Sequence, residues 1–254
     1  MPRVRLDSLL AERGLFESRT RAAAAVIAGE VHLGPGRRRA EKPGQLVDPE
    51  IEIEVQGPPP FVSRGGVKLA NALDTLNLPV EGRRALDVGA STGGFTDCLL
   101  QRGAEHVIAL DVAYGELDWR IREHERVTVI ERTNARSITP DDLPYAPDLI
   151  VSDVSFISLT KVLPAVLATA GPTFDCLAMV KPQFEVGKDR IGKGGVVRDL
   201  ELRREAVRTV AASVDVAVMG SAPSALAGPS GNRETFLWLA EGSRAGAIAE
   251  VEAW

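Results

Sequence analysis

The sequence predicts a two-part protein in which a doubly wound, mostly parallel α/β sheet follows a small α+β unit. Short apolar segments alternate with helical ones from about residue 66 onward, which is typical of a parallel sheet covered on both faces. A Gly-Pro-Pro-Pro run at 57–60 interrupts the chain before them. We therefore expect one domain at 1–56, a proline-rich linker at 57–62 and a second domain at 63–254.

The N-terminal unit should begin with two helices and end in short strands. The first helix carries its apolar face from Leu6, and Gly14 can end it in a left-handed conformation. Ser18 can cap a second helix, which stops before Gly29. The segments expected next are a strand at 31–33, a glycine-proline turn at 34–36, a basic run at 37–39 and an alternating strand at 51–55.

The second domain alternates between the two kinds of element. Helices are expected at 66–76, 95–102, near 119, at 158–169 and at 200–212. Strands are expected at 85–88, 107–112, 127–130, 149–153, 176–180, 214–219 and 235–240. The final strand is expected at an edge of the sheet, so Glu234 before it would be a solvated carboxylate.

Charge is distributed unevenly along the chain. The formal net charge is -5, but residues 1–45 hold nine Lys or Arg and five Asp or Glu, a net +4, which leaves -9 for the rest. A basic end on an acidic body is expected when a small module binds a polyanion.

Several protein classes are disfavoured. Asp7, Glu12 and Arg13 interrupt the N-terminal segment, which argues against a signal peptide, and no apolar stretch is long enough to span a membrane. The two cysteines, Cys98 and Cys176, form neither a disulfide framework nor a metal-ligand motif. We expect a cytoplasmic protein that binds no metal and no membrane.

A glycine-rich turn follows the first strand of the second domain. In Asp87-Val-Gly-Ala-Ser-Thr-Gly-Gly-Phe-Thr-Asp97 the glycines would let a ligand approach the backbone at the carboxyl edge of the sheet. The next strand ends near Asp111, whose carboxylate can accept hydrogen bonds from a ribose. The spacing matches neither phosphate-binding glycine motif. A nucleoside cofactor without a pyrophosphate fits best.

Polar residues also follow the later strands. Asn134, Asp153 and Lys181 stand where a parallel sheet presents ligands. Lys181 ends a strand that should be buried, and Asp153 could hold its ammonium, so the pair could act as a base. From the residues alone, Lys68 would be interpreted as a charge on a helix surface and Glu234 as a solvated carboxylate.

The chain resembles a known family through ten motifs spread over nearly its whole length. RLDSLLAERG, SRTRA, IAGEVHL and KPGQLV resemble an S4 RNA-binding domain, with a departure at VHLGPG. FVSRGGVKL, DVGASTGGFTD, LIVSDVSF, VKPQFEVGK, GKGGVVRD and SGNRETFL resemble FtsJ-like ribose 2′-O-methyltransferases. Their order is similar to that of the TlyA family of ribosomal RNA methyltransferases, whose members are also called haemolysins.

The resemblance implies a Rossmann-like class I methyltransferase sheet behind a small S4 domain, and a specific set of site residues. A catalytic tetrad would consist of Lys68, Asp153, Lys181 and Glu234. S-adenosylmethionine would be bound by Gly89, Ser91, Thr92, Gly93, Gly94, Phe95, Asp111 and Asn134. In the implied chemistry, Lys181 acts as a base or steers the lone pair of the 2′-hydroxyl, and Asp153 holds the lysine.

Basic residues are expected to contact RNA phosphates rather than to read the RNA sequence. They are Arg3, Arg5, Arg13, Arg19, Arg21, Arg64, Lys188 and Lys193. The glycine-rich loop 187–198 directly follows the Lys181 segment, and we expect it to be a mobile RNA clamp.

The sequence thus predicts 2′-O-methylation of ribosomal RNA in ribosomal subunits, with cytidine as the implied target. A ribosome-associated RNA-binding protein without catalysis is the first alternative. A membrane-lytic haemolysin is the second, and the lack of a spanning apolar segment or a basic amphipathic membrane helix disfavours it.

Overall fold

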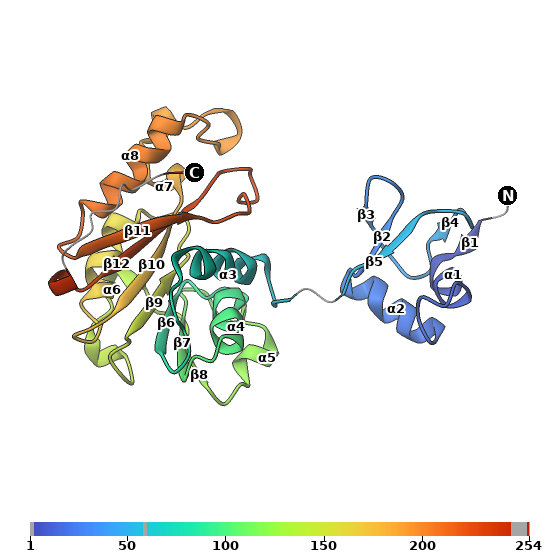
Figure 1. Cartoon of the computed structure of the whole chain (residues 1–254), viewed down its shortest axis with the longest axis horizontal. Coiled ribbons are helices and arrows are strands. Elements are labelled where there is room, and N and C mark those ends of the chain that lie inside the picture. The colour runs from blue at the N-terminus through green and yellow to red at the C-terminus, as the bar shows by residue number, and fades with distance from the viewer. Residues whose placement is uncertain (1–2, 58–59, 245–252, 254) are drawn as a thin grey trace. The chain divides into compact units, whose positions relative to one another are not determined.

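The computed structural model describes residues 3–57, 60–244 and 253, and it divides the chain into two compact units at 1–60 and 61–254. Figure 1 shows their elements. Within the described part, no helix is both long enough and apolar enough to cross a membrane.

The first unit is built from two helices and short antiparallel strands. Its elements are β1 Val4–Arg5, α1 Leu6–Glu12, α2 Arg19–Ala28, β2 Val31–Leu33, β3 Arg38–Arg39, β4 Leu46–Val47 and β5 Ile53–Val55. Strands β3, β2 and β5 form one sheet in that order, and β1 pairs with β4. Leu6, Leu10 and Val26 are fully or almost fully buried between the helices and strands.

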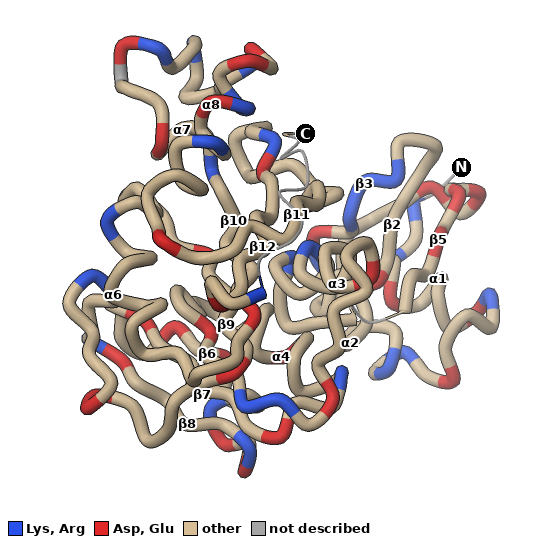
Figure 2. Tube along the Cα trace, turned by 60° about the vertical axis from the view of Figure 1, so that its left-hand side comes forward, with Lys and Arg blue, Asp and Glu red and all other residues tan. Residues whose placement is uncertain are grey.

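Local signals set both helices of this unit. The Ser18 side chain accepts a hydrogen bond from Arg21 N, 3.2 Å away, and Gly29 ends α2 at φ 84°. Gly14 follows α1 at φ 69°, as predicted. Strands β1, β3 and β4 were not predicted, because a two-residue strand has no periodic pattern and exists only through its distant partner. The basic run at 37–39 includes strand β3, and Figure 2 shows its charges there.

The second unit contains a seven-stranded sheet. Its strands are β6 Arg84–Val88, β7 His106–Leu110, β8 Val127–Ile130, β9 Leu149–Ser152, β10 Asp175–Val180, β11 Ala217–Pro223 and β12 Thr235–Ala240. Their order is β11-β12-β10-β9-β6-β7-β8, and β12 runs antiparallel to both of its neighbours. The mostly parallel, doubly wound sheet predicted from the sequence is confirmed.

Helices cover both faces of this sheet (Figure 1). The α-helices are α3 Arg64–Leu76, α4 Gly94–Gln101, α5 Trp119–Arg122, α6 Leu163–Leu167, α7 Pro182–Glu185 and α8 Leu200–Ala211. Short 3₁₀ helices are η1 Ala135–Ser137, η2 Pro140–Asp142, η3 Leu159–Lys161, η4 Lys188–Arg190, η5 Lys193–Gly195 and η6 Gly242–Arg244. Apolar residues of α3 and α4 pack on one face, and those of α6 and α8 pack on the other.

Three predictions about these elements were wrong. The helix expected at 158–169 is divided into η3 and α6, because Pro164 in the first turn of α6 has no N–H to continue a preceding helix. Strand β11 lies at 217–223 rather than 214–219, and its small residues Gly220 and Ala222 hide the apolar pattern. Strand β12 is an interior strand, so Glu234 is 2% exposed instead of solvated.

Candidate functional site

The carboxyl ends of β6, β9 and β10 meet the start of α3 and the turn before β12 around one cavity of about 430 Å³. Parallel strands end at the same edge of a sheet, so their following loops meet there. The cavity is lined by Ser63, Arg64, Gly65, Lys68, Gly89, Ala90, Ser91, Thr92, Gly94, Phe95, Asp153, Ser155, Lys181, Pro229 and Glu234.

The turn after β6 needs its glycines for close contacts. Gly89 has φ 86°, and a Cβ atom there would lie 2.7 Å from the carbonyl oxygen of Asp153. A Cβ on Gly94 would collide with Ser63 Oγ and lie 3.0 Å from Gly66 N. Both contacts are shorter than a side chain tolerates, so only glycine lets the turn pack against the neighbouring loops. Gly93 does not line the cavity but packs beneath Leu117 at φ 94°.

A second cavity, of about 370 Å³, opens at the end of β7 and shares Gly89, Ser91, Asp153 and Ser155 with the first. The carboxylate of Asp111 lines it and accepts hydrogen bonds from Ser91 N at 2.7 Å and Ala113 N at 2.8 Å. The exposed Asn134 lines the same cavity. Glu116, which the sequence reasoning missed, also lines it and accepts a hydrogen bond from Ser91 Oγ at 3.2 Å.

Lys181 is fixed by two partners at the end of β10. Its Nζ lies 2.6 Å from Asp153 Oδ1 and donates a hydrogen bond to Ser155 Oγ at 2.7 Å. The lysine is 8% exposed overall, so both contacts are largely shielded from water. Ser155 was not among the predicted residues, although its place two positions after Asp153 at a strand end is a signal that could have identified it.

Lys68 and Glu234 form a second ion pair in the same cavity. Their side chains are 9% and 2% exposed. From the residues alone, both are expected to be solvated charges. The structure corrects this, because α3 places Lys68 on its buried face and β12 lies inside the sheet. Two lysine-carboxylate pairs therefore line one cavity.

An exposed aromatic residue stands beside these pairs. Phe156 is 92% exposed and has φ 63°, a left-handed conformation that a large side chain rarely adopts. Its ring lies 5.4 Å from that of Phe184. The Glu185 carboxylate holds the same loop by accepting hydrogen bonds from Ser158 Oγ at 2.5 Å and Leu159 N at 2.9 Å. Burial raises the pKa of this carboxyl.

Asp87 is a further titratable group beneath the glycine turn. It is 0% exposed, and its Oδ2 accepts a hydrogen bond from Thr96 Oγ1 at 2.7 Å. Burial raises the pKa of Asp87 to about 7, and the charge of Asp153 adds to the shift, while the Thr96 hydroxyl opposes it.

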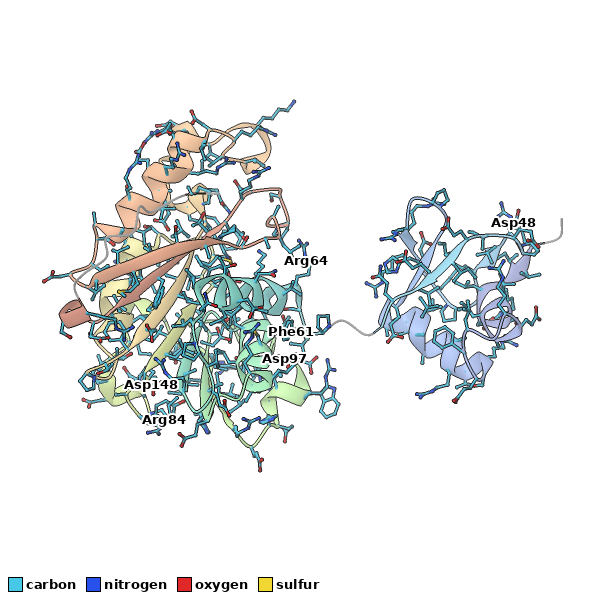
Figure 3. All side chains as sticks on the ribbon, viewed as in Figure 1. Asp48, Phe61, Arg64, Arg84, Asp97 and Asp148 are labelled. Atoms are coloured by element: carbon cyan, nitrogen blue, oxygen red, sulfur yellow. The ribbon has the colours of Figure 1, made fainter. Side chains whose placement is uncertain are left out.

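The start of the second unit packs on the same region. Val62 N donates a hydrogen bond to Asp97 Oδ2 at 2.8 Å, and the Phe61 ring covers Gly66. Figure 3 shows Phe61 next to Asp97, with Arg64 nearby. Arg64 donates a hydrogen bond to the carbonyl oxygen of Ala227 at 2.9 Å. Two residues of the expected linker thus belong to the packed surface of this unit.

The basic residues predicted to contact RNA differ in their ion pairs, hydrogen bonds and exposure. Arg5 and Arg19 both pair with buried Asp7, at 2.7 and 3.1 Å, and Arg5 holds the pKa of that carboxyl well below its usual range. Arg13 donates to backbone carbonyl groups of Ile51 and Pro49. Arg3 and Arg21 are exposed. Arg3 also lines a groove of about 570 Å³ with Arg38 and Arg39.

The predicted RNA clamp at 187–198 is anchored at its far end. Asn232 accepts a hydrogen bond from Val197 N at 2.9 Å and donates one to the carbonyl oxygen of Gly195 at 2.8 Å. Lys193 is exposed on this loop. Lys188 lies in η4, and its side chain is outside the described part of the structure.

Comparison with known proteins gives a consistent result. The model of a family described as FtsJ-like methyltransferase matches residues 61–241. The chain is 48% identical over 242 residues to the 16S/23S rRNA (cytidine-2′-O)-methyltransferase TlyA of Mycobacterium tuberculosis, a match that covers 93% of this chain and 90% of that protein.

Two further likenesses extend over most of the chain. A protein of Brachyspira hyodysenteriae named Hemolysin A is 40% identical over 203 residues, covering 80% of this chain and 84% of that one. A solved structure from Streptococcus thermophilus, described as a candidate hemolysin, is similar with a TM-score of 0.75 and 39% identity, covering 98% of this chain and 92% of that one.

Proposed function

Because the chain belongs to the FtsJ-like methyltransferase family and, within it, to the TlyA family, we propose that it methylates a ribose 2′-hydroxyl of ribosomal RNA. The proposed target is a cytidine of 16S or 23S RNA, as the name of the Mycobacterium tuberculosis relative suggests. One observation carries the proposal. The pairs Lys68–Glu234 and Lys181–Asp153 line the same cavity as the glycine turn.

The residues around the glycine turn fit S-adenosylmethionine, on which enzymes of this family depend. Gly89 packs against the Asp153 backbone and lines both cavities. Asp111 offers carboxylate oxygens to ribose hydroxyls in the second cavity, and Asn134 lies beside them. Gly89, Ser91, Thr92, Gly94, Phe95, Asp111 and Asn134 would hold the cofactor, with Gly93 shaping the turn. When bound, it supplies an activated methyl group.

Lys181 is the residue we assign to the acceptor hydroxyl. A lysine ammonium has three hydrogen-bond donors; Ser155 Oγ accepts from one, and Asp153 Oδ1 compensates the charge as an ion-pair partner 2.6 Å away. A remaining donor would fix a lone pair of the 2′-hydroxyl, so that the oxygen is oriented for attack. Asp153 holds the ammonium in place, and its carboxylate lies next to the site where the hydroxyl proton must leave.

Lys68 and Glu234 complete the charge network that lines the cavity. Because both side chains are buried, each charge depends on the other for compensation. Their pair holds α3 against the turn before β12, which fixes the cavity width around the acceptor ribose.

We propose that the N-terminal unit is an S4-type module that docks the enzyme on ribosomal subunits. Residues 1–45 carry the net +4 charge, and Arg3, Arg5, Arg19 and Arg21 expose guanidinium groups. Contacts of such groups with phosphates position RNA without reading its sequence. Removing residues 1–60 should weaken ribosomal RNA binding far more than S-adenosylmethionine binding, in titrations at fixed salt. Equal loss of both would contradict the assignment.

The decisive test is to map 2′-O-methylation on ribosomal RNA. Subunits from a strain that lacks the protein are incubated with the purified enzyme and S-adenosylmethionine, and modified nucleotides are located by mass spectrometry. We expect one or a few new methylated riboses with the unaltered enzyme and none with Lys181→Ala or Asp153→Ala, while cofactor binding is retained. Lys161→Ala, which removes an exposed lysine of η3, is the matched control.

The same variants separate the two alternatives. An RNA-binding protein without catalysis would bind the subunits, keep that affinity in Lys181→Ala, and transfer no methyl group in its unaltered form. A lytic protein would release haemoglobin from erythrocytes even after the Lys181–Asp153 pair is broken. Either result would overturn the proposed function.

A further inference from the structure

Glu185, the last residue of α7, joins the two segments that carry the Lys181–Asp153 pair. Its Oε2 accepts a hydrogen bond from Ser158 Oγ at 2.5 Å, and its Oε1 accepts one from Leu159 N at 2.9 Å. The loop at 153–158 follows β9, whereas Lys181 and α7 follow β10. One carboxylate thus connects segments that lie 26 and 27 positions apart in the sequence.

The same two segments contact each other at two further points. Lys181 Nζ lies 2.6 Å from Asp153 Oδ1 and donates a hydrogen bond to Ser155 Oγ at 2.7 Å. Next along both segments, the Phe184 ring lies 5.4 Å from the ring of Phe156. The contacts follow in the same order on both sides, and the two hydrogen bonds to the carboxylate of α7 close the far end of the loop.

Phe156 lies between the two fixed ends of this loop in a left-handed conformation, with φ 63°. Such a conformation is unfavourable for a large side chain and persists only when the surrounding structure imposes it. Before it, Ser155 is bound by Lys181, and after it, Ser158 is bound by Glu185. If the hydrogen bonds to Glu185 are lost, the loop can relax at Phe156 into an ordinary conformation, which turns the backbone that carries Ser155.

The surroundings of Glu185 do not favour a charged side chain. Burial raises the pKa of its carboxyl, and the hydrogen bonds from Ser158 and Leu159 only partly offset this effect. What the side chain contributes here is therefore its pair of hydrogen bonds. Glutamine has the same length, and it can accept from Leu159 N while it donates to Ser158 Oγ, so it can replace both contacts without a charge.

We propose that Glu185 is a positioning residue for methyl transfer. Its hydrogen bonds hold the 153–158 loop in the conformation that presents Asp153 and Ser155 to Lys181, so that the ammonium faces the acceptor hydroxyl in a fixed direction. The described residues that line the two cavities do not include Glu185. This inference rests on the proposed function and adds a residue that acts through Lys181 rather than by touching the substrate.

The test compares Glu185→Ala, which removes both hydrogen bonds, with Glu185→Gln, which can keep them. The single-turnover rate of methyl transfer is measured with saturating ribosomal subunits and S-adenosylmethionine, so that weaker binding of either does not affect it. We expect Glu185→Ala to lower the rate about 10- to 100-fold, because displacing a reacting group by about 1 Å has effects of this size. Glu185→Gln should recover most of the rate.

Glu241→Ala is the matched control near the start of β10, whereas Lys181 follows the end of that strand. The Glu241 carboxylate accepts a hydrogen bond from Phe174 N at 3.0 Å and pairs with Arg244 at 3.0 Å. Its removal should lower the Tm but leave the rate unchanged when activity is expressed per molecule that binds S-adenosylmethionine. A Glu185 with a purely structural role would behave in the same way.

Ser158→Ala removes one of the two contacts and should lower the rate less than Glu185→Ala does. The double variant should be about as slow as Glu185→Ala, because both changes break the same contact. An unchanged rate in Glu185→Ala, or a Glu185→Gln variant that is equally slow, would overturn the inference. If Glu185→Ala does not fold, Ser158→Ala decides, and an unchanged rate in that variant would overturn it.

Hydrogen exchange of the loop amides separates this inference from the proposed function. The amides at 154–159 should exchange faster in Glu185→Ala than in Glu185→Gln, and equal exchange would contradict the role of the two hydrogen bonds. If the unaltered enzyme binds subunits but transfers no methyl group, the proposed function fails, and the exchange rates still show whether Glu185 holds the loop.

Discussion

Lys68 of α3 and Glu234 before β12 form a buried ion pair across 166 positions of sequence. Lys68→Ala leaves the Glu234 charge buried without compensation, which typically costs about 3–5 kcal/mol. We expect a matching drop in the free energy of unfolding, measured with urea, and loss of methyl transfer.

A double variant separates stability from chemistry at this pair. Lys68→Met with Glu234→Leu replaces both charges by apolar side chains of similar size, which is often neutral for stability. We expect it to unfold near the wild-type urea concentration while remaining inactive. If the double variant methylates ribosomal RNA, the pair has only a structural role.

Gly89→Ala should reduce cofactor binding and activity far more than replacing a glycine at positive φ that has open space around it. The new methyl group would meet the Asp153 carbonyl oxygen at 2.7 Å and displace the loop that holds Lys181. We expect isothermal titration to show lost S-adenosylmethionine affinity, together with lost activity.

Gly115→Ala is the matched control, since Gly115 has φ 77° but open space around its Cβ position. It should cost only about 1 kcal/mol of backbone strain. Equal effects would show that steric contact at Gly89 is unimportant.

Phe156→Ala should lower methyl transfer without lowering stability. The ring is 92% exposed, so its removal loses little packing, and its φ of 63° is already unfavourable. Because Phe156 is exposed next to Ser155 and lines the second cavity, we expect its ring to stack on the target nucleotide. We expect kcat/KM for subunits to fall at least about tenfold, which corresponds to a stacking energy of 1–3 kcal/mol. An unchanged kcat/KM would show that Phe156 does not contribute to RNA binding or catalysis.

Asp87 should make stability depend on pH. Its folded-state pKa of about 7 lies above its ordinary value of 3.8, so between these values the folded protein binds more protons than the unfolded chain. The free energy of unfolding therefore falls as the pH rises toward 7. In Asp87→Asn, which has no carboxyl group to ionise at this position, it should not fall in this way. The variant should gain about 3 kcal/mol relative to wild type between pH 5 and pH 8, measured by urea unfolding. A pH-independent difference would mean that Asp87 is ionised throughout.

Local signals made much of the fold predictable. Ser18 and Gly29 bound α2 as their capping preferences require, and β12 occupies its predicted residues 235–240. Each of these depends on a few neighbouring residues, so the sequence pattern carries the information. By contrast, β1 and β4 are two residues long and depend on each other across the unit.

The candidate site also contains residues that the sequence predicted and residues that only the structure revealed. The glycine turn and the polar residue after each strand could be found from the sequence, because parallel strands end at one edge. Ser155 and Glu116 were missed, because each is defined by a contact with a residue distant along the chain.

The sequence by itself determined the two-part organisation, the doubly wound sheet and the family. Periodic apolar residues, helix caps and motifs each depend on residues close together in the chain, so they can be recognised in the sequence. Only the tertiary structure decided that Glu234 is buried opposite Lys68 and that Phe156 is exposed in a strained conformation. Burial and charge compensation arise when distant segments exclude water from one another, and no local pattern records which segments will do so.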